Sequence, residues 1–185
     1  MRPKSLVSFI SMPTFVAVAA LVGTVALALD TAALDKQVAA TLDKFYTLNP
    51  KNKDLVQTAA AVLVFPNITK GGIGIGGEHG DGSLQQGGSS VGYYPISGAS
   101  IGLTLGLSHH SEVIVFKTAE ARDKFVKGGD WSVGADASVA VAKQGAGGAY
   151  DTQTMNKPVN AFIFGERGLM GDVSLQGAKI SKIAR

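Results

Sequence analysis

The sequence predicts an α+β fold: two N-terminal helices packed on a curved, largely antiparallel β-sheet, barrel- or sandwich-like, with one further helix. Three observations predict it. Residues 30–61 place apolar side chains three or four positions apart, as amphipathic helices do. From residue 62 onward the apolar period is two, which is typical of strands. One helical pattern at 118–126 interrupts these strands, and this order of elements favours an antiparallel sheet.

Glycine alternates with Ile or Leu in two tracts, residues 69–80 and 98–107. One face of each tract carries branched apolar side chains, and the other face carries almost none. Glycine weakens an isolated strand, so its repeated use indicates that backbone or side chains from elsewhere approach closely. We therefore expect tightly curved sheet and not a flexible linker.

The first 28 residues have the pattern of a signal peptide. Arg2 and Lys4 form a charged start, an apolar stretch covers 15–29, and Ala-Leu-Ala at 26–28 is a small-x-small cleavage site. A retained membrane anchor is the alternative, because the apolar run approaches spanning length. Asp30, which is acidic and suited to start a helix, favours cleavage.

The expected organisation is therefore a signal peptide at 1–28 and a single domain at 29–185, exported and periplasmic or associated with the outer envelope. The chain has no cysteine, which excludes both an acylated lipoprotein and a disulfide. Of its 17 Lys and Arg, two leave with the leader, so 15 face 14 acidic residues and the net charge is +1. This balance is not that of a nucleic-acid-binding protein.

Two helices are expected first. Asp30 or Thr31 can cap a helix through Phe45, with a polar side that includes Asp35. Asn49-Pro50 ends it, and Asn52 can cap a second helix through about residue 61. The apolar residues of these helices that should face inward are Leu34, Val38, Leu42, Leu55, Ala59 and Val62. The charged residues that should face outward also include Lys36, Asp43 and Lys44.

Strands are expected next, with Gly80-Asp81-Gly82 and Gly87-Gly88-Ser89 as hairpin turns and His109-His110 at a bend. Thr118 caps the late helix, Ala121 and Phe125 face inward, and Gly128-Gly129 ends it. Residues 143–157 are expected to form a long surface loop. The expected strands are 62–65, 72–80, 83–87, 90–94, 98–107, 111–116, 131–141, 161–164 and 169–180.

Two motifs resemble those of enzymes. Residues 72–77 satisfy G-x-G-x-x-G, but no helix can follow them, so a dinucleotide site is not expected. Residues 98–102 satisfy G-x-S-x-G, but Ser100 lies within a strand pattern and not at a strand-to-helix turn. We therefore expect no enzyme and no cofactor. An esterase using Ser100, with His109, His110 or Asp136 as partners, is the third hypothesis for the function.

A metal site is a further alternative. His79, His109 and His110 could bind an ion together with Glu78 or Glu112. Adjacent histidines on a strand point to opposite faces, and no ligand spacing recurs, so exposed histidines are the expectation.

Basic residues are the stronger candidates for a binding site. Four lie on and beside the late helix, three follow the last acidic residue, Lys70 is expected in a turn with accessible N–H groups, and Arg167 follows a strand. Such residues usually extend into solvent. Near an anionic surface each contributes about 1 kcal/mol of attraction. The candidate contacts are Lys70, Lys117, Arg122, Lys124, Lys127, Arg167, Lys179 and Lys182.

Six segments, in order and with matching spacing, resemble the SYLF domain: residues 61–66, 69–80, 91–94, 129–134, 145–148 and 162–170. The resemblance covers roughly 32–185. SYLF domains of eukaryotes bind phosphoinositides in membrane-trafficking proteins, and yeast members bind actin. The stand-alone domain behind a signal peptide is similar to bacterial members.

The resemblance implies a non-catalytic lipid-binding module of the cell envelope that recognises anionic phospholipid or phosphoinositide-type headgroups at a membrane surface. No nucleic acid is expected as a partner. The alternative is a structural or protein-interaction module of the envelope, which the near-neutral charge and the glycine-faced strands also favour.

Overall fold

The computed structural model describes residues 16–129, 131–132, 138–144, 156–168 and 179–180. The chain divides into two units, Met1–Ala33 and Leu34–Arg185, of which the second contains the sheet. Over the residues described, none of the helices combines the length and apolar content needed to span a membrane. The expected N-terminal leader and domain boundary remain predictions.

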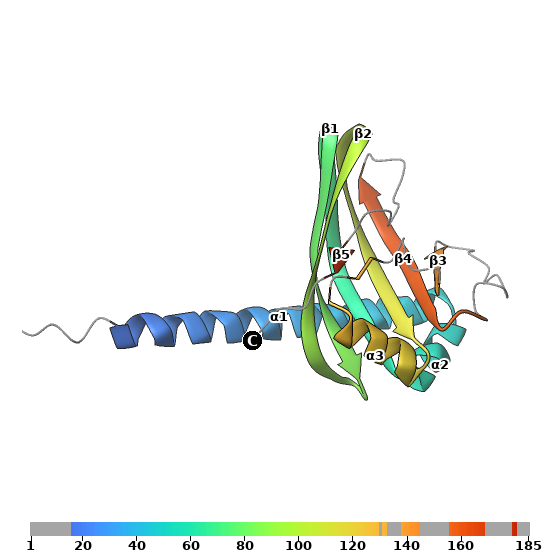
Figure 1. Ribbon diagram of the computed structural model, residues 1–185, viewed down its shortest axis with the longest axis horizontal. Coiled ribbons are helices and arrows are strands. Elements are labelled where there is room, and N and C mark those ends of the chain that lie inside the picture. The colour runs from blue at the N-terminus through green and yellow to red at the C-terminus, as the bar shows by residue number, and fades with distance from the viewer. Residues whose placement is uncertain (1–15, 130, 133–137, 145–155, 169–178, 181–185) are drawn as a thin grey trace, which may run out of the picture. The chain divides into compact units, whose positions relative to one another are not determined.

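The described residues of the second unit contain a five-stranded sheet with the order β1-β2-β4-β3, in which β5 pairs with β2 (Figure 1). Each pairing among these strands is antiparallel except that of β3 with β4, which is parallel. The α+β architecture with a largely antiparallel sheet is therefore confirmed. The strands are β1 (Ala61–Gln86), β2 (Ser89–Phe116), β3 (Val139–Gln144), β4 (Val159–Gly168) and β5 (Lys179–Ile180).

One long hairpin, β1 with β2, supplies most of the sheet. Gly87 and Gly88 form its turn with φ of 59° and 82°, so that predicted turn is confirmed. The predicted turn at Gly80-Asp81-Gly82 is wrong, because these residues continue β1 opposite residues 94–96. The predicted bend at His109-His110 is also wrong, because both residues lie within β2 opposite β1.

The hairpin curls because its glycines let one half of β1 lie against the other. A Cβ at Gly82 would stand 2.5 and 2.6 Å from ring carbons of Phe65, and one at Gly80 would stand 2.7 Å from the carbonyl oxygen of Asn67. Register shifts interrupt the pairing, one of them between Ile73 and Ile75, and such irregularities bend strands. The prediction of tightly curved sheet with close approaches at glycine is confirmed.

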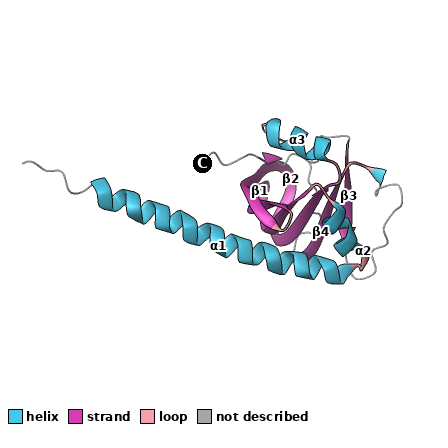
Figure 2. Ribbon diagram, turned by 90° about the horizontal axis from the view of Figure 1, so that it is seen from below, coloured by secondary structure: helices cyan, strands magenta, loops and turns pink. Residues whose placement is uncertain are grey.

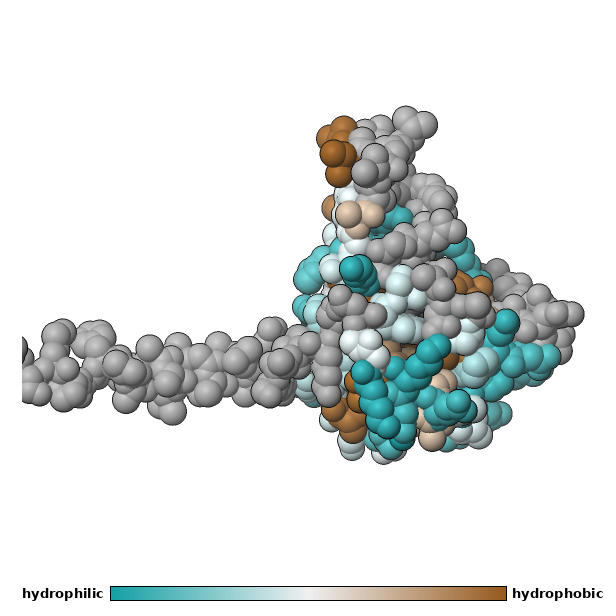
Figure 3. Space-filling view, viewed as in Figure 1, coloured by the Kyte–Doolittle hydropathy of each residue, from teal (hydrophilic) through white to brown (hydrophobic). Residues whose placement is uncertain are grey.

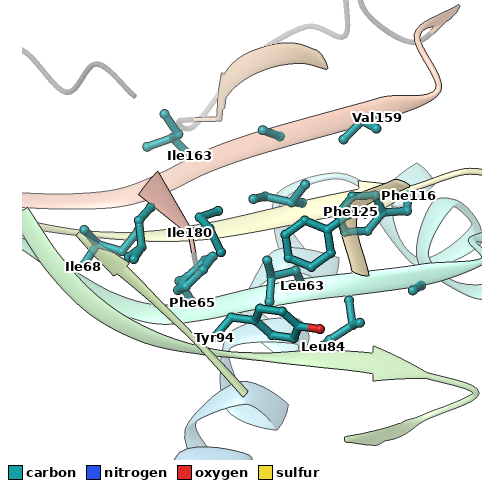
Figure 4. Close-up of a cluster of buried hydrophobic side chains, with 14 residues drawn as sticks. Leu63, Phe65, Ile68, Leu84, Tyr94, Phe116, Phe125, Val159, Ile163 and Ile180 are labelled. Carbon is teal, nitrogen blue, oxygen red and sulfur yellow. The ribbon is translucent and has the colours of Figure 1, made fainter. Parts of the chain in front are cut away.

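Two apolar cores lie on the two faces of the sheet. Leu63, Phe65 and Ile114 belong to the core on the inner, curled face. Figure 4 shows Leu63 beside the rings of Tyr94 and Phe125 in this core. The residues between them along the same strands, such as Val64 and Val113, point to the opposite side and belong to the core on the outer face. This alternation is the period of two that the sequence shows.

Helices cover both faces. Helix α3 (Ala119–Lys127) covers the inner core through Phe125, whose ring centroid lies 5.0 Å from that of Phe116. On the outer face, Phe45 of α1 (Val16–Leu48) stacks on Phe164 at 5.5 Å. Figure 2 shows α3 and α2 (Lys51–Thr58) on opposite sides of the sheet.

The helix boundaries differ in part from the predictions. Helix α1 already begins at Val16, so Asp30 and Thr31 lie within it, and the prediction that one of them starts it is wrong. Asn52 is not a cap: it is buried within α2, and its Nδ2 donates to the carbonyl oxygen of Phe45 and to Oε1 of Gln144, at 2.6 and 3.0 Å. Helix α3 is confirmed, because Thr118 Oγ1 accepts a hydrogen bond from the Ala121 N–H.

The later strands are confirmed in part. Val159–Gly168 contains the predicted strand 161–164. Of the predicted strand 131–141, residues 139–141 lie in β3 and Trp131 forms an isolated bridge with Ile180, whereas Ser132 and Ser138 are not in a strand. The predicted loop at 143–157 is wrong at its start, because Lys143 and Gln144 lie in β3 and pair with β4. Most of the rest of that loop and of the predicted strand at 169–180 lies outside the described residues.

Candidate functional site

The basic residues on and beside α3 lie close to acidic residues. Arg122 Nη2 lies 2.6 Å from Oδ1 of Asp123, and Lys127 Nζ lies 3.8 Å from Oδ2 of the same side chain. The hydrogen bond from Arg122, and then its charge and that of Lys127, lower the pKa of Asp123. Lys117 and Lys124 are exposed on the same part of the fold. The structure therefore brings together four of the predicted cations, with Asp123 offsetting part of their charge.

The other predicted cations are distributed over the sheet. Arg167 is exposed near the end of β4, opposite His109, and Lys179 is exposed in β5, opposite Ser97. Lys70 is not in the predicted turn: it lies within β1 opposite Ser108 and is only 8% exposed. Lys182 lies outside the described residues.

An apolar elbow lies where the hairpin folds over, and we define it by Ile73, Ile75 and Leu107. Their exposed fractions are 83%, 71% and 54%. Figure 3 shows hydrophobic surface at the top of the view, over the end of the sheet where β1 and β2 are labelled in Figure 1. The alternation of glycine with Ile and Leu placed these residues in curved sheet, but nothing in it indicated that they form an exposed surface.

Arg167 shares a sheet face with part of this elbow. Arg167 pairs with His109, and Leu107 stands two residues from His109 on β2. Alternate residues of a strand, and residues directly opposite each other, project from the same face. Leu107 lies over Gly71, where an added Cβ would stand 2.9 Å from its Cδ1. The exposed Arg167 therefore lies on the same sheet face as the exposed Leu107 of the elbow.

A buried polar cluster lies on the inner face, formed by Lys70, Glu78, His110 and Glu112. Burial, and then the charge of Glu78, raise the pKa of Glu112 to about 8. Burial first, then nearby Lys70, Lys143 and His109, lower the pKa of His110 to about 4. Glu78 also has a raised pKa because it is buried, although Lys70 opposes the shift.

Several polar atoms of this inner cluster have no hydrogen-bond partner among the described residues. They are both carboxyl oxygens of Glu112, both ring nitrogens of His110 and Oε2 of Glu78. A neutral carboxyl group and a neutral imidazole limit the cost of this burial. Glu112 stands two and four residues before Ile114 and Phe116 in the same strand, and alternate residues of a strand point to the same face. The sequence of 111–116 could therefore have indicated that Glu112 points inward.

An amphiphilic groove of about 530 Å³ lies between α1, α2 and the turn end of the hairpin. Apolar side chains of the helices and of β1, such as Val38, Leu42 and Val56, form one wall. Asp35, Ser90 and Tyr93 contribute polar groups to its lining. The sequence placed Asp35 on the polar side of its helix, and no local signal indicated a partner 55 residues away.

The described residues of the enzyme and metal alternatives lie on strands, and Asp136 lies outside the described residues. Ser100 pairs with Gly76 inside β2, and no helix begins there or at Gly77. His109 and His110 alternate across β2, and Nδ1 of His109 lies 3.0 Å from Oγ1 of Thr69. Within the described part of the chain, no group of three His, Cys, Asp or Glu residues could hold a metal ion.

Comparison with known proteins gives one family. Residues 97–184 match the family described as Ysc84: Las17-binding protein actin regulator. The matched segment begins in β2 and extends through α3, β3, β4 and β5. No curated protein matches the chain.

Proposed function

Because residues 97–184 match the Ysc84 (SYLF) family, we propose that this protein is a non-catalytic lipid-binding module of the cell envelope. It binds anionic headgroups at a membrane surface through its basic residues. The family is associated with lipid- and actin-binding modules, which supports the broader assignment.

The observation that carries the proposal is the apolar elbow with Arg167 beside it. Burying an Ile side chain is worth about 1.5–3 kcal/mol, so three partly exposed aliphatic side chains provide a substantial gain on contact with lipid. Exposed apolar patches of this kind mark sites of membrane or protein interaction. The guanidinium adds about 1 kcal/mol next to an anionic leaflet.

Liposome flotation tests the proposal. The full chain is mixed with vesicles of phosphatidylglycerol and phosphatidylcholine, or of phosphatidylcholine alone. We expect retention on the anionic vesicles and a decrease with added salt, because screening weakens the contribution of each cation. Equal and negligible retention on both vesicle types rules the proposal out.

A protein-interaction module of the envelope is the second candidate. The description of the matched family, a Las17-binding actin regulator, favours it, because it names protein partners. The same elbow then contacts a protein surface. A pull-down from envelope extract separates the two: one stoichiometric protein partner without bound lipid supports this candidate.

A further inference from the structure

The amphiphilic groove is separate from the basic residues and from the apolar elbow. Its helical wall presents apolar side chains from Val38, Leu42 and Val56. Clefts of roughly 300–1,000 Å³ with an apolar lining and a few convergent polar groups are the usual form of small-molecule sites. At about 530 Å³ this groove has the size and the lining for a ligand with one apolar chain.

Asp35 is held in a defined position at this groove. Its Oδ1 accepts a hydrogen bond from Ser90 Oγ at 2.6 Å, and its Oδ2 accepts one from Tyr93 Oη at 2.9 Å. Ser90 in turn accepts hydrogen bonds from Gln85 Nε2 and Ser83 Oγ, at 2.7 and 3.0 Å. These contacts join α1 to the hairpin and orient the carboxylate before any ligand arrives.

Asp35 is also the one charged side chain among the described residues that line the groove. A carboxylate has about four lone-pair sites, so two hydroxyl donors leave capacity for another donor. A cationic headgroup gains from this charge, whereas an anionic headgroup is repelled by it. The chemistry of the groove therefore differs from that of the basic residues.

We propose that the groove binds a single-chain amphiphile with a positively charged headgroup, such as a long-chain amine. The chain lies against the wall formed by Val38, Leu42 and Val56, and the ammonium group donates to Asp35. This site does not depend on the proposed binding of anionic membranes, because it uses other residues and the opposite charge.

Calorimetric titration of the full chain with dodecylammonium chloride and with sodium dodecanoate, each below its micelle-forming concentration, tests the proposal. We expect saturable one-to-one binding of the ammonium compound, about tenfold or more tighter than that of dodecanoate. Absence of binding, or equal affinity for both compounds, overturns the proposal.

Asp35→Asn should weaken dodecylammonium binding about tenfold and abolish the preference over dodecanoate. Asp43→Asn is the matched control, because Asp43 is an exposed carboxylate on the same helix outside the groove lining. Equal effects of the two substitutions contradict the assignment of Asp35.

A second pair of variants does not disturb the hydrogen bonds of Asp35. Ala39→Trp places a large ring in the groove from an exposed position of its lining, and Ala40→Trp places the same ring outside it. We expect Ala39→Trp alone to abolish binding of dodecylammonium. Retained binding in Ala39→Trp overturns the proposal even if Asp35→Asn fails to fold, and flotation on anionic vesicles should be unchanged in both variants.

Discussion

The buried Glu112 shows how one side chain makes stability depend on pH. Its pKa is raised from an ordinary value of 4.5 to about 8, first by burial and then by Glu78. Between these pH values the folded chain keeps a proton that the unfolded chain loses, so stability falls as pH rises. His110 acts oppositely: its pKa is lowered from 6.5 to about 4, so its contribution makes stability rise between pH 4 and 6.5.

We therefore expect a net loss of stability between pH 6.5 and 8, where His110 no longer opposes Glu112. The loss should be on the order of 1–2 kcal/mol. Glu112→Gln should reduce the loss, because a neutral amide replaces the titrating group. Urea unfolding at the two pH values measures it, with the exposed Glu120→Gln as control. Equal stability of the parent at both pH values contradicts the prediction.

Gly82 illustrates a residue whose lack of a side chain is required by packing. A methyl group there would meet two ring carbons of Phe65 and stand 2.9 Å from the carbonyl oxygen of Val64. Gly82→Ala should lower the free energy of unfolding by about 1–3 kcal/mol, as overpacking does. Gly77→Ala is the matched control in the same strand, because its Cβ meets only the Gly98 carbonyl oxygen at 3.5 Å.

Denaturant unfolding of both glycine variants measures the difference. If Gly77→Ala lowers the free energy of unfolding as much as Gly82→Ala, the loss comes from replacing any strand glycine. The close approach of the two halves of β1 at Gly82 would then not explain it.

At the scale of the element, the long hairpin is what exposes the apolar elbow. Ile73 pairs with Leu105 and Ile75 with Ile101, so β2 contains more residues than β1 between these pairs. Such an irregularity bends the pair of strands, and the apolar side chains at the bend are exposed to solvent. The elbow is thus a consequence of the curl that builds the inner core.

The elbow yields a prediction for membrane binding. Replacing Ile73 and Ile75 with Ser should reduce flotation on anionic vesicles at least about tenfold, because about 3–6 kcal/mol of apolar transfer energy is removed. The paired control is Val91→Ser, a substitution of a β2 side chain that is 55% exposed and lies near the turn end of the hairpin. Unchanged flotation of the double variant, with folding intact by circular dichroism, would show that the elbow does not contact lipid.

At the scale of the whole molecule, overall charge is a weak guide to the ligand. The formal charge of the chain is +3, and two of its basic residues lie in the expected leader. Long-range attraction to an anionic surface is therefore small, and binding must come from local placement of cations and apolar side chains.

Export is a prediction for the whole chain. Cleavage after Ala28 should give a mature protein that begins at Leu29, because residues 26–28 have the small-x-small pattern of a cleavage site. N-terminal sequencing of the protein isolated from the envelope fraction measures this. A chain that retains Arg2 and Lys4 would support the membrane-anchor alternative instead.

Local chemistry was sufficient for several elements of the fold. The capping Thr118, the inward Phe125 and the ending at Gly128-Gly129 predicted α3, because all these interactions act within one or two helical turns. The alternation of Ile and Leu with glycine predicted curved strands, because a period of two arises within each strand from the alternating direction of its side chains. The six segments resembling the SYLF domain likewise indicated the family whose model matches residues 97–184.

Three features depended on contacts between distant residues. Gly80 and Gly82 resemble turn glycines in the sequence, yet neither has positive φ, whereas Gly87 and Gly88 do. A glycine permits both a turn and a close approach, so only the folding of β1 onto itself distinguishes them. The pairing of Asp35 with Ser90 and the meeting of Glu78 with Glu112 follow from that same fold-back, because each joins residues more than 30 positions apart in the chain.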